Sequence, residues 1–163
     1  MNNQELMIIK QAIINEIEGY EFYNMASSKA SSIEVKNAFL ELAEEEMQHV
    51  TWLKDLFNKI KDDNIVDFQL ALISEPTSPK IFKWDNIDRR DAAIVVSAFG
   101  IGIQMEKASI EFYEKAAKET ELKDAKDLYN ILIKWEKVHL DKFASQYEDL
   151  KEDWWSEQGY APF

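Results

Sequence analysis

Apolar residues recur along this chain at alternating spacings of three and four over four long stretches. That period places them on one face of an α-helix, so the pattern predicts helices over about 3–28, 32–60, 86–118 and 122–150. The same alternation marks the buried seam of helices that pack into a bundle. In the third helix the predicted seam positions are Val96, Phe99, Ile103, Glu106, Ile110 and Tyr113.

The segments between these helices carry caps and helix breakers. Ser31 followed three residues later by Glu34 predicts a capping box at the start of the second helix. Pro76 and Pro79 interrupt residues 61–85, which nevertheless contain apolar side chains that need cover. We therefore expect this segment to be a long crossover that lies on the protein.

Composition agrees with one all-helical domain over residues 1–163. The chain is 46% hydrophobic, enough for a sizeable core, and contains only 4 Gly and 3 Pro. The aromatic tail, residues 151–163, is predicted to be non-helical. The expected fold is an all-α four-helix bundle made of two helical hairpins joined by the crossover.

Charge and cysteine content narrow the function. A net charge of -12 disfavours nucleic acid and anionic membranes as partners. The absence of cysteine excludes disulfides, catalytic thiols and cysteine-ligated metal sites in this chain. The N-terminus lacks the cationic start and apolar block of a signal peptide, and the longest uncharged run, 92–105, is shorter than the ~20 residues that span a bilayer. We expect a cytoplasmic protein.

Four glutamates and two histidines occupy the middle of the predicted seams. Each histidine follows a glutamate by three residues, and a further glutamate precedes each of these glutamates by thirty residues. The six residues are Glu16, Glu46, His49, Glu106, Glu136 and His139. Residues three apart share a helix face, and the paired glutamates are nearly equidistant from the predicted turns. The six side chains should therefore meet in one layer.

The same spacing reveals an internal repeat. The six residues form three pairs, each offset by 90 residues. Residues 13–49 and 103–139, compared without gaps, are identical at ten positions. About two identities would be expected by chance, so we infer a repeated helical hairpin.

Metal binding explains why a core would contain these groups. Burying an unpartnered carboxylate costs several kcal/mol, and the predicted seams offer no basic residue. Two divalent cations would balance four carboxylates. Oxygen-rich ligands with one imidazole per ion suit iron or manganese, with zinc or cobalt as substitutes in a purified sample. The alternative is that the six side chains are solvated or satisfied within the core.

These motifs resemble the ferritin-like di-metal carboxylate superfamily, and within it the rubrerythrin-like branch. The resemblance covers both hairpins and rests on EIEGYEFY (16–23), EEEMQH (44–49), EKASIEFY (106–113) and EKVH (136–139). It implies a ferritin-like bundle around two iron ions.

The resemblance also implies roles for single residues. Glu46 and Glu136 would bridge the two ions, with one remaining Glu–His pair at each ion: Glu16 with His49, and Glu106 with His139. Tyr23 and Tyr113 match tyrosines that hydrogen-bond metal-ligating carboxylates in relatives, although plain packing aromatics are the alternative. No residue is an obvious nucleophile, so the metal centre would carry the chemistry.

The implied function is a di-iron oxidoreductase that reacts with hydrogen peroxide or O2 and takes electrons from an external electron-transfer protein. Two features depart from peroxide-reducing rubrerythrins: Ser109 replaces an additional glutamate, and the cysteine-ligated rubredoxin domain is missing. We therefore expect slower peroxide reduction than in a typical rubrerythrin. The alternatives are an iron-oxidising or metal-handling protein and a structural metal-binding bundle without turnover. We expect a homodimer.

Other polar and aromatic residues receive simpler interpretations. Four off-seam glutamates are predicted to be solvated or at an interface: Glu18, Glu21, Glu44 and Glu111. Glu45 is grouped with them but is also the candidate for an outer contact to the ligands. Four tryptophans are interpreted as packing against the crossover or in a dimer interface, with an electron path or a partner surface as the alternative: Trp52, Trp135, Trp154 and Trp155.

Overall fold

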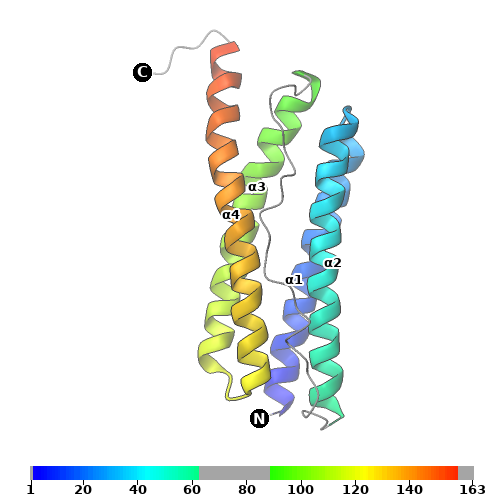
Figure 1. Cartoon of the computed structure of the whole chain (residues 1–163), viewed down its shortest axis with the longest axis vertical. Helices are drawn as coiled ribbons and strands as arrows, with labels where there is room; N and C mark the ends of the chain where they lie inside the picture. Colours follow the sequence, from blue (N-terminus) through cyan, green and yellow to red (C-terminus); the bar gives the residue numbers. More distant parts are fainter. Residues whose placement is uncertain (1, 63–88, 158–163) are drawn as a thin grey trace.

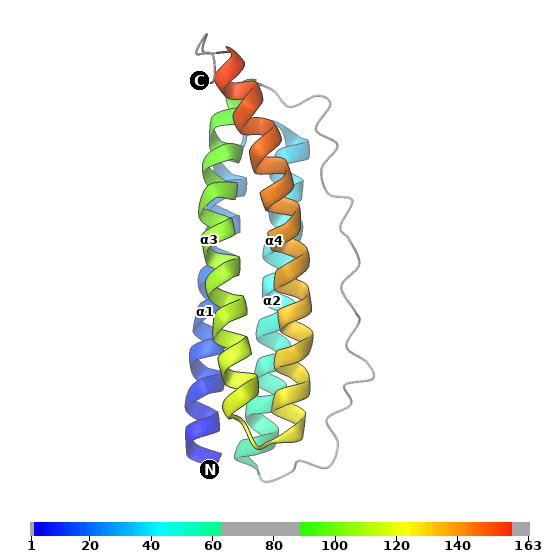
Figure 2. The ribbon, with the colours of Figure 1, turned by 90° about the vertical axis from the view of Figure 1, so that its left-hand side faces the viewer.

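The computed structural model of the chain describes residues 2–62 and 89–157. In this part of the chain the elements are α1 (Asn2–Lys29), α2 (Ile33–Lys61), α3 (Arg89–Glu119) and α4 (Lys123–Glu157). α1 packs mainly against α2 and α3 mainly against α4, so each pair forms an antiparallel hairpin (Figure 1). The two hairpins lie side by side in an elongated bundle (Figure 2). The predicted all-α, ferritin-like four-helix bundle is confirmed.

The end of α2 and the start of α3 lie at opposite ends of the bundle. α2 and α3 point in the same direction, so the chain leaves α2 at one end and enters α3 at the other (Figure 1). The predicted crossover, 61–85, lies almost wholly outside the described residues, and so does the predicted start of the third helix at 86. α2 itself ends at Lys61.

The start of α2 differs from its prediction by one residue. The N-cap is Ser32, whose Oγ accepts a hydrogen bond from the backbone N of Val35 at 3.3 Å. The predicted cap was Ser31. Either serine has a suitable hydroxyl, and the side chain that reaches a free backbone N–H of the first turn decides which one is the cap.

The end of α4 also differs. The helix continues to Glu157, so the predicted end at 150 and the predicted non-helical tail are wrong over residues 151–157. This stretch, KEDWWSE, contains neither glycine nor proline. The next glycine or proline along the chain is Gly159. Nothing in it stops a helix, because aromatic residues lower helix propensity only slightly and do not end a helix.

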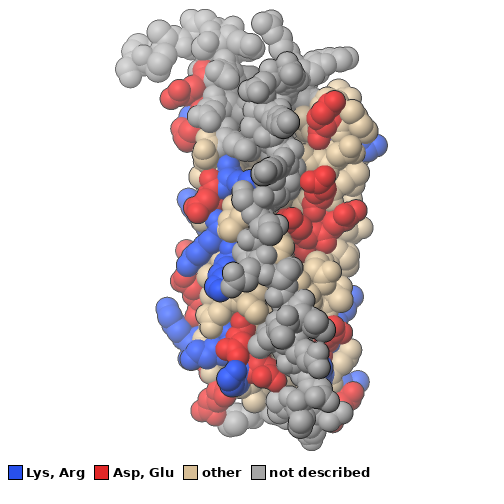
Figure 3. All heavy atoms as spheres, in the orientation of Figure 1, with Lys and Arg blue, Asp and Glu red and all other residues tan. Residues whose placement is uncertain are grey.

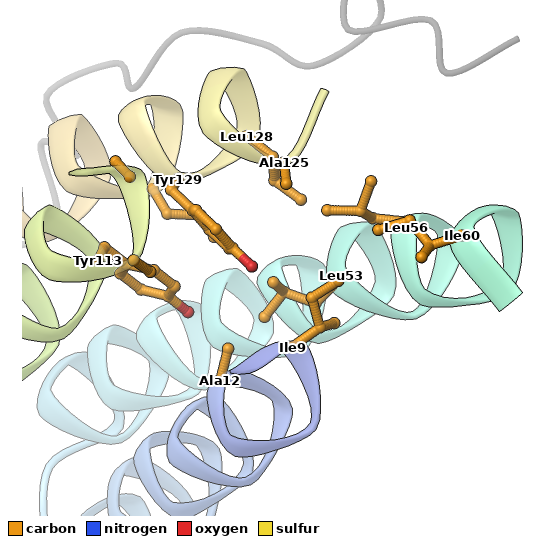
Figure 4. Packing of buried hydrophobic residues seen from close by; sticks show 12 residues of the cluster. Ile9, Ala12, Leu53, Leu56, Ile60, Tyr113, Ala125, Leu128 and Tyr129 are labelled. Atoms are coloured by element: carbon orange, nitrogen blue, oxygen red, sulfur yellow. The ribbon is translucent and has the colours of Figure 1, made fainter. Parts of the chain in front are cut away.

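Apolar side chains fill the bundle on both sides of its middle. One cluster draws on all four helices and includes Ile9, Leu53, Tyr113 and Tyr129 (Figure 4). The other contains Phe39, Phe99 and Phe143, each at most 1% exposed. Burying a side chain of this size contributes about 1.5–3 kcal/mol.

The apolar face of α3 is rotated slightly from its prediction. Val95 is 0% exposed, whereas Val96, predicted at the seam, is only partly buried. The spacing from Val95 to Phe99 is four residues rather than three, and a helix of 3.6 residues per turn accommodates either.

The described surface carries charged side chains of both signs. Asp and Glu side chains are spread along the face in Figure 3, with Lys and Arg between them. One helix segment, Ala93–Glu119, is long and apolar enough to cross a membrane by length and composition alone. Its buried residues, Phe99 and Tyr113 among them, pack inside the bundle, as those of any core helix do.

Candidate metal centre

The six residues predicted to bind metal come together at mid-length, between the two apolar clusters. α1 and α3 each supply one glutamate, and α2 and α4 each supply one glutamate and one histidine. The exposed fractions are small throughout: Glu16 2%, Glu46 4%, His49 0%, Glu106 3%, Glu136 1% and His139 1%. The predicted layer of buried polar side chains is therefore present.

Their donor atoms fall into two groups, and within each group the atoms lie within 4.8 Å of one another. One group is Glu16, Glu46, His49 and Glu136; the other is Glu46, Glu106, Glu136 and His139. Glu46 and Glu136 belong to both groups. That shared position is what a carboxylate needs in order to bridge two ions.

Both imidazoles turn Nδ1 toward the carboxylates. His49 Nδ1 lies 3.0 Å from Glu16 Oε2 and 3.3 Å from Glu136 Oε1. His139 Nδ1 lies 3.6 Å from both Glu106 Oε1 and Glu136 Oε2. The Nδ1 atoms are therefore the candidate metal donors, and each Nε2 is left for an outer partner.

Two tyrosines tie the hairpins together at this layer. Tyr23 on α1 donates its hydroxyl hydrogen bond to Glu106 Oε1 on α3 at 2.7 Å. Tyr113 on α3 donates to Glu16 Oε1 on α1. Each tyrosine thus orients the carboxylate of the opposite hairpin, and both are 1% exposed.

The outer nitrogens of the two histidines meet different surroundings. His139 Nε2 lies 2.7 Å from Glu45 Oε2, so Glu45 makes the outer contact for which it was the candidate. His49 Nε2 has no hydrogen-bond partner among the described residues. The rings of Trp52 and Trp135 lie 5.5 Å from the His49 ring instead. The other four off-seam glutamates are exposed.

A pocket opens beside His49. It has a volume of about 260 Å³, and among the described residues Trp52 and Trp135 line it. Acidic side chains of α2, Glu41 and Glu44, form its rim together with Glu45 and Gln48. The pocket brings solvent-accessible space up to one end of the buried cluster.

Burial and mutual repulsion shift the carboxylates unequally. Burial, followed by the charges of Glu136 and Glu16, raises the pKa of Glu46 well above its ordinary value. Burial and the charge of Glu136 raise the pKa of Glu106 to about 8. Burial alone would raise the pKa of Glu136, but hydrogen bonds to Glu106 and both histidines bring it well below its ordinary value. In the metal-free protein, Glu46 and Glu106 therefore hold protons while Glu136 is ionised. This protonation reduces the electrostatic repulsion among the buried carboxylates.

The histidines take part in the same balance. Burial lowers the pKa of His49, but hydrogen bonds to Glu136, Glu16 and Glu46 outweigh it, so the net shift is upward. His139 behaves in the same way through Glu106 and Glu136. In the metal-free protein, the protonated imidazoles therefore supply positive charge beside the buried carboxylates.

The donor set fits a pair of divalent ions. Glu136 Oε1 and His139 Nδ1 are buried and make no hydrogen bond of good geometry, and a bound cation that displaced the protons would satisfy both atoms. Two ions would supply four positive charges for four carboxylates, with one imidazole each, a set that suits iron or manganese. That these six residues bind metal stays a prediction.

Glu5 is a buried carboxylate that was not among the predicted site residues. Glu5 is 6% exposed and accepts hydrogen bonds from Tyr129 Oη at 2.5 Å and from Thr120 Oγ1 at 2.6 Å. Its helical spacing was the available signal. Glu5, Ile9, Ala12 and Glu16 follow one another at intervals of four, three and four, so Glu5 lies on the buried face of α1.

Comparison with known proteins gives one match. The family model described as Rubrerythrin matches residues 7–147, a span that includes both hairpins and all six cluster residues. Neither a curated protein nor a solved structure matches the chain.

Proposed function

Because this chain belongs to the rubrerythrin family, we propose that it binds two iron ions and acts as an oxidoreductase on hydrogen peroxide or O2. The observation that carries the proposal is the pair of four-residue donor groups that share Glu46 and Glu136. A structural histidine or a solvated glutamate pattern does not require six convergent, buried donors with this sharing.

In this proposal the six ligands are shared between two ion positions. Glu46 and Glu136 reach both positions, Glu16 and His49 complete one, and Glu106 and His139 complete the other. Tyr23 and Tyr113 fix the orientation of the two terminal carboxylates by hydrogen bonds. Bound iron supplies reversible one-electron redox change and Lewis acidity, which the side chains around it lack.

The pocket beside His49 is our proposed route for the oxidant. Its rim is acidic, so it favours small uncharged molecules such as hydrogen peroxide and O2 over anions. Trp52 and Trp135 cover the His49 ring and restrict the entry of bulk water.

The electrons for turnover come from outside this chain in our proposal. The chain contains no cysteine, so it has no cysteine-ligated iron centre of its own. Ser109, one turn after Glu106 on α3, adds no carboxylate to the cluster. We therefore expect reaction with peroxide to be slower than in relatives that have a glutamate at this point.

An anaerobic Fe(II) titration of the metal-free protein tests the proposal. The expected endpoint is two iron ions per chain, because two donor groups are present. Substoichiometric hydrogen peroxide or O2 is then added and the absorbance recorded. Rapid oxidation to an oxo-bridged iron spectrum supports an oxidoreductase, and the faster oxidant identifies the substrate class.

Variants at the two histidines test the ligand assignment. His49→Ala and His139→Ala should each lower the endpoint to one ion, because each removes the only imidazole from one group. Gln48→Ala is the matched control, since Gln48 is exposed and precedes His49. Two ions bound in both histidine variants would disprove the assignment.

The same titration separates the alternatives. Many turnovers of iron oxidation with a growing mineral would indicate a metal-handling protein. Two irons that never oxidise would indicate a structural site, with manganese or zinc as the ions to test next. Either outcome would leave the donor geometry intact and remove the proposed reaction.

A further inference from the structure

A buried polar cluster outside the metal ligands has no polar counterpart in the internal repeat. Glu5, Tyr129 and Thr120 have Val95, Phe39 and Ala30 as their counterparts 90 residues away. Val95 and Phe39 are both 0% exposed. The equivalent position at the other end of the bundle is therefore filled by apolar side chains. The fold does not require polar groups here, and a buried carboxylate is costly, so the Glu5 cluster needs another explanation.

Geometry connects this cluster to the candidate metal centre. Tyr113 hydrogen-bonds Glu16, one of the predicted ligands. The Tyr113 ring is stacked on the Tyr129 ring, with centroids 5.9 Å apart and an interplanar angle of 27°. Figure 4 shows the two rings neighbouring each other among aliphatic side chains. Tyr129 in turn donates its hydroxyl hydrogen bond to Glu5.

The link between the two tyrosines is a ring contact. Each hydroxyl points to its own carboxylate, Tyr113 to Glu16 and Tyr129 to Glu5. A proton cannot pass from one phenol to the other through stacked rings, whereas an electron can. The arrangement therefore suits electron transfer along the stack, with a local proton acceptor at Tyr129.

The surroundings of Tyr129 favour coupled loss of an electron and a proton. Burial, then the hydrogen bond to Glu5, raises the pKa of Tyr129, so the phenol is protonated at neutral pH. Oxidation of a protonated phenol is accessible only if its proton leaves as well. Glu5 Oε1, 2.5 Å away, is positioned to receive that proton. Thr120 Oγ1 also donates to Glu5 and fixes the carboxylate in place.

We propose that Tyr129 is a redox-active tyrosine that gives an electron, through the Tyr113 ring, to the metal centre when O2 is the oxidant and both ferrous ions have already given up one electron each. In this step the O–H bond of Tyr129 breaks, the proton forms an O–H bond on Glu5, and the electron reduces the centre by one unit. The product is a neutral tyrosyl radical. Reduction of O2 to water takes four electrons and two ferrous ions supply two, so Tyr129 supplies a third. Hydrogen peroxide takes only two electrons and needs no further donor. The inference rests on the proposed function for its oxidant.

Freeze-quenched electron paramagnetic resonance tests the step. The protein, loaded anaerobically with Fe(II), is mixed with O2 and frozen at increasing times. We expect a tyrosyl radical signal that narrows when the protein contains ring-deuterated tyrosine. Absence of the signal while iron is oxidised at two ions per chain would overturn this inference and leave the proposed function standing.

Variants that restore the apolar counterparts keep the test specific. Tyr129→Phe should abolish the signal, and Glu5→Val should reduce it by more than half while iron binding stays unchanged. Both replacements copy side chains that the other end of the bundle already accommodates, and thermal unfolding checks that the variants fold. Tyr147→Phe, in the half of the bundle that contains Phe39 and Phe143, is the control and should retain the full signal. A signal that persists in Tyr129→Phe would place the radical elsewhere and refute the assignment.

A second measurement needs no iron. A flash-generated ruthenium(III) polypyridyl complex is used to oxidise the metal-free protein, and the yield of tyrosyl radical is recorded by transient absorption. The wild type should give more radical than Glu5→Val, and Tyr129→Phe should give less than Tyr147→Phe. Equal yields in all four proteins would show that Glu5 does not assist oxidation of Tyr129 and would overturn the inference, whatever the iron titration gives.

Discussion

Gly19 on α1 leaves the space in which the Glu46 carboxyl group lies. A Cβ atom at this position would stand 3.2 Å from Glu46 Cδ, closer than ordinary van der Waals contact. Alanine is about 1 kcal/mol more favourable than glycine inside a helix. We therefore expect Gly19→Ala to keep or raise the stability of the metal-free protein while weakening the binding of iron. Thermal unfolding in chelator and an Fe(II) titration measure the two effects separately.

Gly100→Ala is the matched control for this prediction. A Cβ atom at Gly100 would lie 3.3 Å from the ring of Tyr147, a side chain outside the metal cluster. Gly100→Ala therefore gives α3 the same increase in helix propensity without adding an atom next to the metal cluster. Equal loss of iron binding in both alanine variants would show that the space beside Glu46 is unimportant.

Glu45 makes the two halves of the centre unequal. Its carboxylate lies 2.7 Å from His139 Nε2, and the equivalent repeat position is Trp135, beside His49. A carboxylate on the outer nitrogen orients an imidazole and increases its basicity, and losing such a contact costs about 10–100-fold in metal affinity. We expect Glu45→Gln to weaken one of two ions by this amount in a competition titration. Glu44→Gln, at an exposed neighbour, should have no effect.

The candidate ligands could be predicted because each helix carries its own donors at seam spacing. Glu46 and His49 are three residues apart, and the repeat duplicates them as Glu136 and His139. Contacts that depend on the rotation of one helix against another could not be derived in this way. Glu45 on α2 reaches His139 on α4, and Glu5 on α1 reaches Thr120 beside the α3–α4 turn. Spacing within one helix says nothing about either distance.

At the scale of the helices, buried apolar residues one turn away from the predicted ligands hold the layer of ligand side chains in place. Leu132 lies one turn before Glu136 on α4 and is 0% exposed. Truncating a buried leucine to alanine costs about 2–5 kcal/mol through lost burial and the remaining cavity. We expect Leu132→Ala to lower the free energy of unfolding by that amount in urea titrations of the metal-free protein.

Ile101 provides the comparison, because it lies on α3 with 52% of its surface exposed. Ile101→Ala should change the free energy of unfolding by about 0.5 kcal/mol or less. If the two variants lost the same stability, the core assignment from burial would be wrong.

The helices themselves were predictable from periodicity, but their ends were not. The spacing of apolar residues shows that a helix is present but not where it begins or ends. The boundary depends on single residues such as the cap at Ser32. α4 runs to Glu157 because no breaker intervenes, although the change to an aromatic composition suggested an earlier end. The crossover, 61–85, could be predicted only as a length of chain that returns along the bundle.

The whole molecule folds around a charge imbalance that protons or metal ions must neutralise. The pKa of Glu106 is about 8 in the metal-free fold, against an ordinary value of 4.5. The pKa values of Glu46, His49 and His139 are also raised. Such groups bind more protons when folded than when unfolded. Their stabilising contribution is complete below the unfolded pKa and is lost as the pH rises through the folded one.

Glu136 has the opposite shift and does not reverse this trend. Its lowered pKa stabilises the fold above the ordinary value of 4.5, and this contribution is lost only as the pH falls below that point. Between pH 4.5 and about 8 the raised groups therefore decide the slope. The metal-free protein should become steadily less stable across this window.

Metal binding should respond to pH in the opposite direction. Iron competes with the protons on the same carboxylates and imidazoles, so its affinity should rise over the window in which metal-free stability falls. Unfolding temperatures with chelator and with Fe(II) under anaerobic conditions, measured between pH 4.5 and about 8, should therefore diverge as the pH increases. Glu106→Gln removes one of the responsible groups and should flatten the metal-free slope. A metal-free stability that rises with pH would contradict this account, because the buried cluster would then not be retaining its protons.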